Sequence, residues 1–281
     1  MVGSRDFSTR LFGLWLPLIA FVVVTLFPFY WMLITSVKAN AELYNARLFP
    51  MIVRQPTLQH YIDLLSKTAF VQWTINTMVV ALSTTLISLV LGTMAAYPLA
   101  RMRFPGAALI AMAIAATYLV PQTVLFIPMA DLIFRMGLQN SLWAVILTYP
   151  TFLIPFCAWL LMGYFKTVPR ELEESARIDG ASRFQAMMRV VLPLCIPGLL
   201  SAGIFAFTLS QNEFLYALIF LSKSEVRTVP VGAITELIRG DVFYWGQLMA
   251  AALLGSIPVA IIYSFFVEHY VAGLTVGAVK N

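Results

Sequence analysis

A charged segment interrupts the sequence at residues 170–193, which read RELEESARIDGASRFQAMMRVVLP. Between residues 166 and 189 the chain carries five basic and four acidic side chains, nine of its 31 charged residues. Long apolar runs lie directly on both sides of this segment. A segment of this composition is expected to lie outside the membrane, as a structured loop between two membrane-embedded stretches.

The composition around this segment is that of a membrane protein. Of the 281 residues, 60% are hydrophobic and 11% are charged, whereas soluble domains are about 25% charged. About 20 apolar residues in a helix cross a bilayer. We expect an all-α polytopic membrane protein with six transmembrane helices in a single domain over residues 1–281. The six predicted spans are residues 11–37, 68–100, 104–130, 136–165, 190–222 and 242–267, and the charged loop is residues 166–189.

The distribution of Lys and Arg predicts the orientation of the chain. Ten of these residues fall on the side of the predicted termini and eight on the other side, and the loops of the first side are shorter. Arg5 and Arg10 flank the first span, so we place both termini in the cytoplasm. The apolar run that follows reaches Val37, which is longer than a signal-peptide core, so this span is expected to be retained. The net charge of +5 includes no basic tract, so nucleic acid is not an expected partner.

Motifs for catalysis or cofactor binding are missing from the sequence. The chain has no phosphate-binding loop, so it is not expected to bind ATP. His60 and His269 are far apart, and Cys157 and Cys195 fall within apolar runs. Neither a metal set nor a catalytic constellation is apparent, so the chain by itself is not expected to be an enzyme or to hold a cofactor.

The fifth predicted span contains Glu213, the single charged residue within the six spans, in the polar sequence SQNEF at 210–214. One interpretation is a hydrogen-bond clamp between helices, and the other is a polar patch on a hydrated solute path. The candidates for the translocation path are Asn76, Gln211, Asn212 and Glu213. Aromatic residues near span ends fit an interfacial belt, although one or two could form a platform on which a sugar stacks. They are Phe29, Tyr30, Trp31, Trp73, Trp143, Trp159, Tyr244 and Trp245.

Start and stop signals predict two helices within the charged loop. Pro169 fits the first turn of a helix, and Glu173 and Arg177 have the spacing of a favourable ion pair. Gly180 is placed to end this helix. Ser182 then has the spacing of a capping box with Gln185, which predicts a second helix that continues into the fifth span. One face of the first helix, called the docking face below, has small residues at its centre and consists of Leu172, Ser175, Ala176 and Asp179.

The same loop carries a family resemblance. Glu174-Ser175-Ala176, then Gly180, then Val190-x-Leu192-Pro193 is similar to the EAA signature of permease subunits of binding-protein-dependent ABC importers. That family has Ala where Ser175 stands and usually Ile where Val190 stands. The sequences QNEF (211–214) and GLTVGAVKN (273–281) resemble the carbohydrate-uptake branch, which includes the shorter maltose permease subunit. Relatives often have Trp where this chain has Gln211, which separates this position from the family pattern.

The resemblance implies the fold and partners of a type I ABC importer in a bacterial or archaeal inner membrane. The partners would be a second homologous permease, two ATPase subunits that bind ATP and Mg, an extracytoplasmic solute-binding protein and membrane lipid. The charged loop would carry the coupling helix that docks on an ATPase, through Leu172, Glu174, Ser175, Ala176, Arg177, Asp179 and Gly180. A C-terminal tail contact to the ATPases would involve Thr275, Val276, Gly277, Ala278, Val279 and Lys280.

The expected function is therefore that of an importer permease for a carbohydrate or carbohydrate-like solute. This subunit would form half of the translocation pathway. A stand-alone secondary transporter or channel is the alternative, but it would need ion-coupling groups or an inverted repeat, and Glu213 is the one such group found. An integral membrane enzyme would need a convergent set of catalytic groups, which the sequence does not offer. No motif in the sequence specifies the identity of the solute.

Overall fold

The computed structural model describes residues 10–45 and 47–278, and for 267–278 it describes the helical backbone alone. The described residues form two compact units, one built from those up to residue 70 with 233–257, the other from 71–232 with 258–278. The elements of the first unit are η1 (Leu11–Trp15), α2 (Leu16–Ser36), α3 (Asn40–Leu43), α4 (Gln59–Lys67), β1 (Ile238–Arg239), β2 (Val242–Phe243) and the start of α16 (Trp245–Ala278). Those of the second unit are α5 (Phe70–Arg101), α6 (Ala107–Tyr118), α7 (Gln122–Arg135), α8 (Leu142–Thr148), α9 (Pro150–Thr167), α10 (Arg170–Ile178), α11 (Arg183–Ala186), η2 (Met187–Val191), α12 (Leu192–Leu194), α13 (Ile196–Gln211), α14 (Leu215–Phe220), η3 (Ser224–Val226) and the rest of α16. Helix α15 (Val229–Leu237) begins in the second unit and ends in the first.

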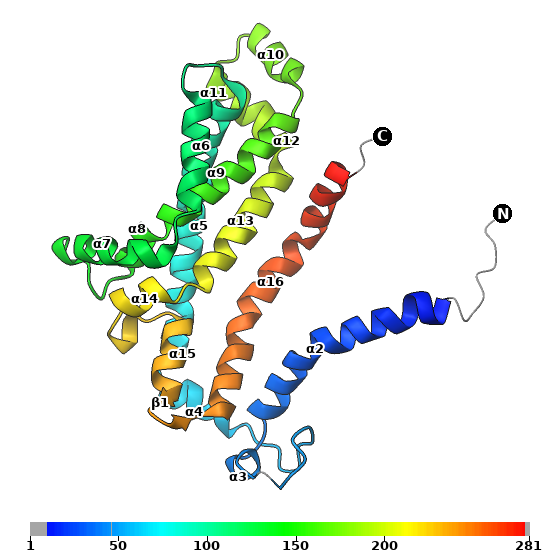
Figure 1. Cartoon of the computed structure of the whole chain (residues 1–281), viewed down its shortest axis with the longest axis vertical. Helices are drawn as coiled ribbons and strands as arrows, with labels where there is room; N and C mark the ends of the chain where they lie inside the picture. The colour runs from blue at the N-terminus through cyan, green and yellow to red at the C-terminus, as the bar shows by residue number, and fades with distance from the viewer. Residues whose placement is uncertain (1–9, 46, 279–281) are drawn as a thin grey trace. The chain divides into compact units, whose positions relative to one another are not determined.

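Helices account for nearly all of this architecture, as expected (Figure 1). Four helical stretches are long and apolar enough to span a membrane: Leu11–Ser36, Phe70–Arg101, Leu142–Thr167 and Trp245–Phe266. Two bent pairs raise the number to six if each pair is one span: Ala107–Tyr118 with Gln122–Arg135, and Arg183–Leu194 with Ile196–Gln211. The prediction of an all-α polytopic fold with six transmembrane helices is confirmed within these bounds.

The bent pairs show where the predicted spans differ from the observed helices. The third predicted span, residues 104–130, contains a turn of 92° between α6 and α7. Pro121 has an extended backbone at that turn and lacks the N–H that a continuous helix would need. The fifth predicted span, residues 190–222, is bent by 79° before α13. Its helix also ends at Gln211, so Glu213 lies between two helices and not within one.

A short β-hairpin occupies the start of the sixth predicted span, residues 242–267. Strands β1 and β2 pair Arg239 with Val242, which leaves Gly240 and Asp241 as a two-residue turn. Gly240 has a φ of +60°, the left-handed conformation that such tight hairpin turns require. The sixth long helix therefore begins at Trp245, three residues later than predicted.

The core of the second unit is centred on α9, which packs against α6 and α13. Residues Leu142–Thr167 are 72% buried over their most apolar stretch, the largest share among the four unbroken candidate spans. Helix α5 approaches α9 closely at Gly92, where an added Cβ would lie 2.8 Å from the Cβ of Cys157. Small residues such as Gly92 permit this helix contact in the membrane.

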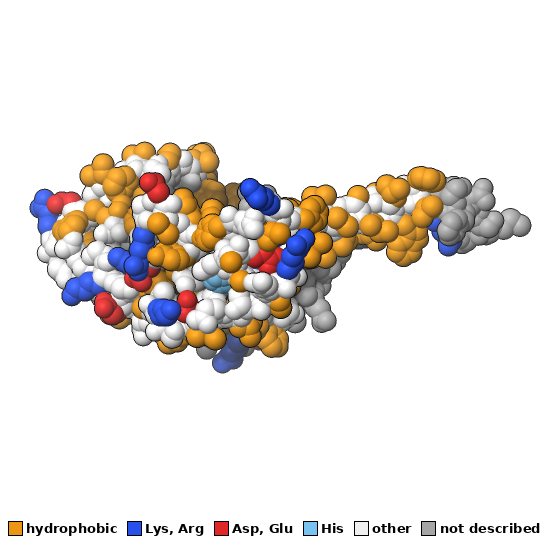
Figure 2. All heavy atoms as spheres, turned by 90° about the horizontal axis from the view of Figure 1, so that it is seen from below, with side chains coloured by type: hydrophobic (Ala, Val, Ile, Leu, Met, Phe, Trp, Pro, Cys, Tyr) orange, Lys and Arg blue, Asp and Glu red, His pale blue; other side chains and the backbone are white. Residues whose placement is uncertain are grey.

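The surface of α2 is apolar on all sides, and none of the most apolar part of Leu11–Ser36 is buried. Figure 2 shows the same helix covered by hydrophobic side chains. A helix that is apolar all round is typical of a membrane span that faces lipid or another membrane helix.

Candidate functional site

The charged loop folds into two short helices, α10 and α11, joined by a tight turn (Figure 1). Helix α10 begins at Arg170, and Pro169 precedes it with an extended backbone as the N-cap. The prediction that Pro169 occupies the first turn is therefore wrong by one residue. Its fixed φ of −55° still directs the chain into the helix, and Glu171 and Glu173 lie in the first turn, near the positive end of the helix dipole.

The turn after α10 follows the predicted stop and restart signals. Gly180 has a φ of +90°, which a residue with a side chain rarely adopts, and its N–H donates to the carbonyl of Arg177. Ser182 and Gln185 form the capping box in full: each side chain accepts a hydrogen bond from the other residue's backbone N–H, at 3.2 Å and 2.8 Å. Both predictions are confirmed, and the loop is a built helix–turn–helix.

Glu173 ties α10 to the end of α5. Its Oε2 atom accepts a hydrogen bond from Nε of Arg101 at 2.9 Å, and its Oε1 atom accepts one from the Tyr97 hydroxyl at 2.6 Å. The predicted pair of Glu173 with Arg177 is thus replaced by a pair with Arg101, 72 residues away in the sequence. The Arg101 side chain is 3% exposed, so this ion pair is largely shielded from water and its groups depend on each other.

Arg101 also binds the end of α9. Its Nη1 atom donates to the carbonyls of Phe165 (3.2 Å) and Val168 (2.7 Å), and its Nη2 atom donates to the carbonyl of Pro169 (3.3 Å). The guanidinium therefore satisfies carbonyls that have no partner at a helix end. One buried side chain therefore holds α5, α9 and α10 together. We call Tyr97, Arg101 and Glu173 the anchor.

The sequence did not reveal this anchor. In the sequence Arg101 has the position of an ordinary loop cation, and no motif distinguishes Tyr97 from the other aromatic residues. Only the unusual placement of an arginine directly after a long apolar run could have marked it.

The docking face of α10 is mostly accessible. Leu172, Ser175 and Asp179 are exposed, and Ala176 is half-buried. Two apolar side chains that the sequence pattern did not single out also point to solvent: Ile178, 85% exposed, and Phe184 on α11.

A basic cleft of about 220 Å³ lies between the end of α5 and this loop. Its lining residues are Arg101, Met102, Arg103, Arg170, Glu173, Glu174, Arg177 and Arg183. Arg101 is the one arginine of this cleft that forms an ion pair within the described part of the chain. The remaining four leave the cleft with an excess of positive charge, which suits acidic groups on a partner.

Glu213, between α13 and α14, has the contacts of a structural clamp. It is buried, and its Oε2 atom accepts a hydrogen bond from the hydroxyl of Tyr149 at 2.7 Å. Its two carboxylate oxygens also accept the backbone N–H groups of Tyr216 and Ala217, at 2.9 Å and 3.2 Å. The carboxylate therefore caps the N-terminus of α14 and fixes it to the start of α9. Of the two interpretations of this residue, these contacts favour the clamp.

Two other candidates for the translocation path, Asn76 and Asn212, have hydrogen-bond partners of their own. Asn76 on α5 is buried and donates to the carbonyls of Glu225 (2.8 Å) and Arg227 (2.9 Å), so it holds the segment around η3. Asn212 donates to the carbonyl of Thr208, and Gln211 is buried at the end of α13. A role of these residues in translocation stays a prediction.

The predicted tail contact falls at the end of α16. Thr275, Val276, Gly277 and Ala278 continue the helical backbone, whereas Val279 and Lys280 lie outside the described residues. Contact of this tail with an ATPase stays a prediction. Within residues 10–45 and 47–278, His, Cys, Asp and Glu form no group of three or more that could hold a metal ion.

Comparison with known proteins identifies the type of permease. The family model described as "Binding-protein-dependent transport system inner membrane component" matches residues 88–276. The sulfoquinovosyl glycerol transport system permease protein SmoH of Agrobacterium fabrum (strain C58) is 39% identical, over 91% of this chain and 89% of that protein. The trehalose/maltose transport system permease protein MalG of Thermococcus litoralis is 33% identical, over 94% of both.

Solved structures agree on the fold. A chain from the crystal structure of a bacterial ABC transporter involved in the import of the acidic polysaccharide alginate superposes with a TM-score of 0.79 at 22% identity. The match covers 96% of this chain and 100% of that one. Because the family model includes α9, the anchored α10 and the bent fifth span, and relatives match nearly end to end, the chain belongs to the inner membrane component family of binding-protein-dependent ABC importers.

Proposed function

We propose that this chain forms half of the translocation pathway of an ATP-driven importer for a carbohydrate or carbohydrate-like solute. Support for the solute class comes from the relatives, whose names specify sulfoquinovosyl glycerol, trehalose and maltose. The family description supports dependence on a binding protein and a place in the inner membrane.

The importer would contain further subunits. A second homologous permease would complete the pathway, and an extracytoplasmic solute-binding protein would deliver the solute. Two cytoplasmic ATPase subunits would bind ATP and Mg, so this chain would need no cofactor of its own. The charged loop and both termini would then lie in the cytoplasm, in agreement with the excess of Lys and Arg on that side.

The observation that carries the coupling mechanism is the anchor on α10. Glu173 binds Arg101 at the end of α5, and Arg101 binds the carbonyls at the end of α9. When the ATPases close around ATP, the docking face would move with them, and the anchor would transmit that motion to α5 and α9. The spans would shift between inward-facing and outward-facing arrangements because the ATPase contacts differ between the two states. The tail from Thr275 to Lys280 would supply a second contact.

Two substitutions in the loop test this mechanism. Glu174→Lys reverses a charge next to the docking face, and Gly180→Leu places a side chain where φ is +90°. Both variants are expected to lose ATP-driven uptake of trehalose or maltose into proteoliposomes that contain the full complex and its binding protein. Membrane insertion, checked by extraction with detergent and gel filtration, should be unchanged.

The matched control is Glu171→Lys, which makes the same charge reversal on the same helix, outside the nominated set. Uptake at the wild-type level in both Glu174→Lys and Gly180→Leu would contradict the coupling role. A separate test uses the purified chain alone, which is expected to hydrolyse no ATP. Hydrolysis without the ATPase subunits would contradict the proposal that ATP is bound and hydrolysed by those subunits and not by this chain.

A further inference from the structure

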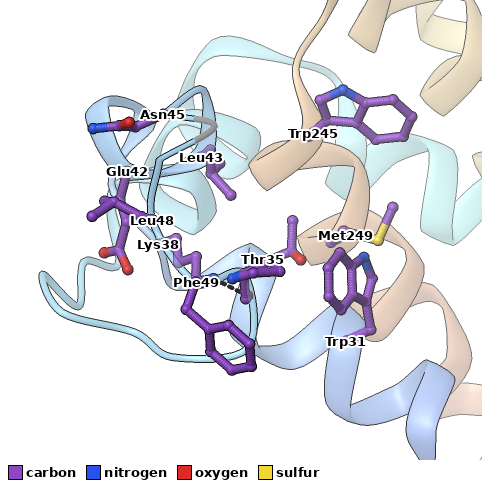
Figure 3. Close-up of a pocket in the computed structure, with 11 residues that line it drawn as sticks. Trp31, Thr35, Lys38, Glu42, Leu43, Asn45, Leu48, Phe49, Trp245 and Met249 are labelled. Atoms are coloured by element: carbon purple, nitrogen blue, oxygen red, sulfur yellow. Dashed lines mark hydrogen bonds between the residues drawn. The ribbon is translucent and has the colours of Figure 1, made fainter.

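A cavity of about 440 Å³ lies in the first unit, between the segment that follows α2 and the start of α16 (Figure 3). This volume falls within the range of about 300–1,000 Å³ that is usual for small-molecule sites. The lining residues are Trp31, Thr35, Lys38, Glu42, Leu43, Asn45, Leu48, Phe49, Pro50, Trp245 and Met249. None of them is part of the coupling loop or of the candidate translocation path.

Hydrogen bonds hold the wall of this cavity in place. The Glu42 carboxylate accepts the backbone N–H groups of Arg54 (3.0 and 3.2 Å) and Gln55 (3.1 Å). The hydroxyl of Tyr44 donates to the carbonyl of Phe243 at 2.6 Å, which ties α3 to β2. Since these bonds fix the wall without a ligand, a ligand would bind with little cost of ordering.

The floor of the cavity is polar and electrically balanced. Thr35, Lys38 and Glu42 are 8%, 5% and 7% exposed. Burial by itself would raise the pKa of Glu42, but the two N–H donors and the charges of Lys38 and Arg54 lower the pKa below its ordinary value, so the carboxylate is ionised. Lys38 is the single basic and Glu42 the single acidic lining residue, so the cavity has no net charge to select a charged ligand.

The lining also carries hydrogen-bonding groups that have capacity left for a ligand. The ammonium of Lys38 donates to the carbonyl of Pro50 and has further protons to donate. The hydroxyl of Thr35 has no hydrogen-bond partner in the described part of the chain, and the same holds for the indole N–H groups of Trp31 and Trp245. Trp245 is held by a parallel stack on Phe243, with ring centroids 5.2 Å apart and planes at 9°.

We propose that this cavity binds a neutral carbohydrate ring. The inference rests on the proposed carbohydrate importer function and adds a site outside the translocation path. Aromatic faces are electron-rich, so the C–H face of a pyranose packs on Trp245, whose ring the stack on Phe243 holds in place. Its hydroxyl oxygens then accept hydrogen bonds from Thr35 and Lys38.

An interfacial belt and a contact with a partner protein both fit the lining of this cavity less well than a carbohydrate does. A belt accounts for aromatic residues at a span end but not for the hydroxyl of Thr35, unpartnered within the described residues, and the ammonium of Lys38 in the same lining. An apolar side chain of a partner protein would fill the space but leave Lys38 and Glu42 desolvated without new hydrogen bonds, which is unfavourable. A polyol satisfies both the apolar and the polar part of the lining.

Binding of maltose and trehalose to the assembled complex tests the proposal. The complex, in lipid nanodiscs and without its binding protein, is titrated with each disaccharide and followed by saturation-transfer-difference NMR. The wild type should give saturable signals from at least one of the two sugars. Trp245→Leu and Thr35→Val should each weaken the apparent Kd by about tenfold, the loss expected for one aromatic stack or one hydrogen bond.

Matched controls are Trp143→Leu, an exposed tryptophan in the second unit, and Thr25→Val on the same helix as Thr35. Both should bind the sugars as the wild type does. The proposal is overturned if neither sugar gives a saturable signal, or if the controls weaken binding as much as the cavity variants. It is also overturned if Trp245→Leu lowers affinity for the binding protein while no sugar binds, because the cavity would then be a protein contact.

The same preparation separates this inference from the proposed function. If the wild-type complex with its binding protein takes up a carbohydrate on addition of ATP, but the cavity binds none, then only the present inference fails. If the complete complex takes up no carbohydrate, the proposed function fails.

Discussion

Glu173→Gln is the substitution that tests the anchor most directly. It keeps the shape of the side chain and removes the charge opposite the buried guanidinium of Arg101. Loss of one member of a buried ion pair costs about 3–5 kcal/mol, and a single hydrogen bond to a charged group contributes about 1.5–3 kcal/mol. Glu173 is 15% exposed and Arg101 keeps three carbonyl acceptors, so we expect about 2–3 kcal/mol.

This interaction energy holds α10 against α5 and α9. Loss of the ion pair should therefore appear as more frequent local opening of α10. A decrease of about 2–3 kcal/mol in the opening free energy raises the hydrogen-exchange rate of the α10 amides by about 30- to 150-fold. The assay is hydrogen–deuterium exchange with mass spectrometry on the permease in detergent, without ATPase subunits. Peptides that cover α10 and, for comparison, α9 report the change.

Glu174→Gln is the matched control, because the neighbouring carboxylate is exposed and forms no ion pair within the described residues. It should leave exchange in α10 unchanged. Tyr97→Phe removes the second contact to Glu173 and should give a smaller increase than Glu173→Gln. Unchanged exchange in Glu173→Gln, or an equal increase in Glu174→Gln, would refute the anchor as the element that holds α10.

Three further predictions concern other parts of the chain. The hydrogen bonds that lower the pKa of Glu42 stabilise the segment around it at pH values above the ordinary pKa of glutamate. That stability is lost as the pH falls through the lower pKa of the folded state. Amide hydrogen exchange in this segment, corrected for intrinsic rates, should therefore rise on acidification in the wild type but not in Glu42→Gln. Tyr149→Phe removes one hydrogen bond to Glu213 and should lower the unfolding free energy in mixed detergent micelles by about 1 kcal/mol, whereas an unchanged value would argue against the clamp. Gly92→Ala places a Cβ 2.8 Å from that of Cys157 and should destabilise the protein by about 1–3 kcal/mol in the same assay, and Cys157→Gly in the same chain should restore part of the loss.

Several features of the site could be predicted because their causes are local. A left-handed Gly180 and the reciprocal bonds of Ser182 and Gln185 depend on residues at most three apart, so the sequence pattern identified them. The amphipathic face of α10 follows from helical spacing alone. The prediction of an ion pair between Glu173 and Arg177 at the same spacing was wrong. Glu173 pairs instead with Arg101, whose side chain has almost no access to water.

The long helices and the family were determined by the sequence by itself, because the length of an apolar run and a local signature require no knowledge of distant contacts. Tertiary structure decided the interruptions of these helices: the 92° turn before α7, the end of α13 before Glu213 and the hairpin before Trp245. It also decided which polar groups meet, since Arg101 with Glu173 and Glu213 with Tyr149 are pairs of residues 72 and 64 positions apart. A buried charge is stable only beside its partner, and helix packing, not sequence spacing, brings that partner within reach.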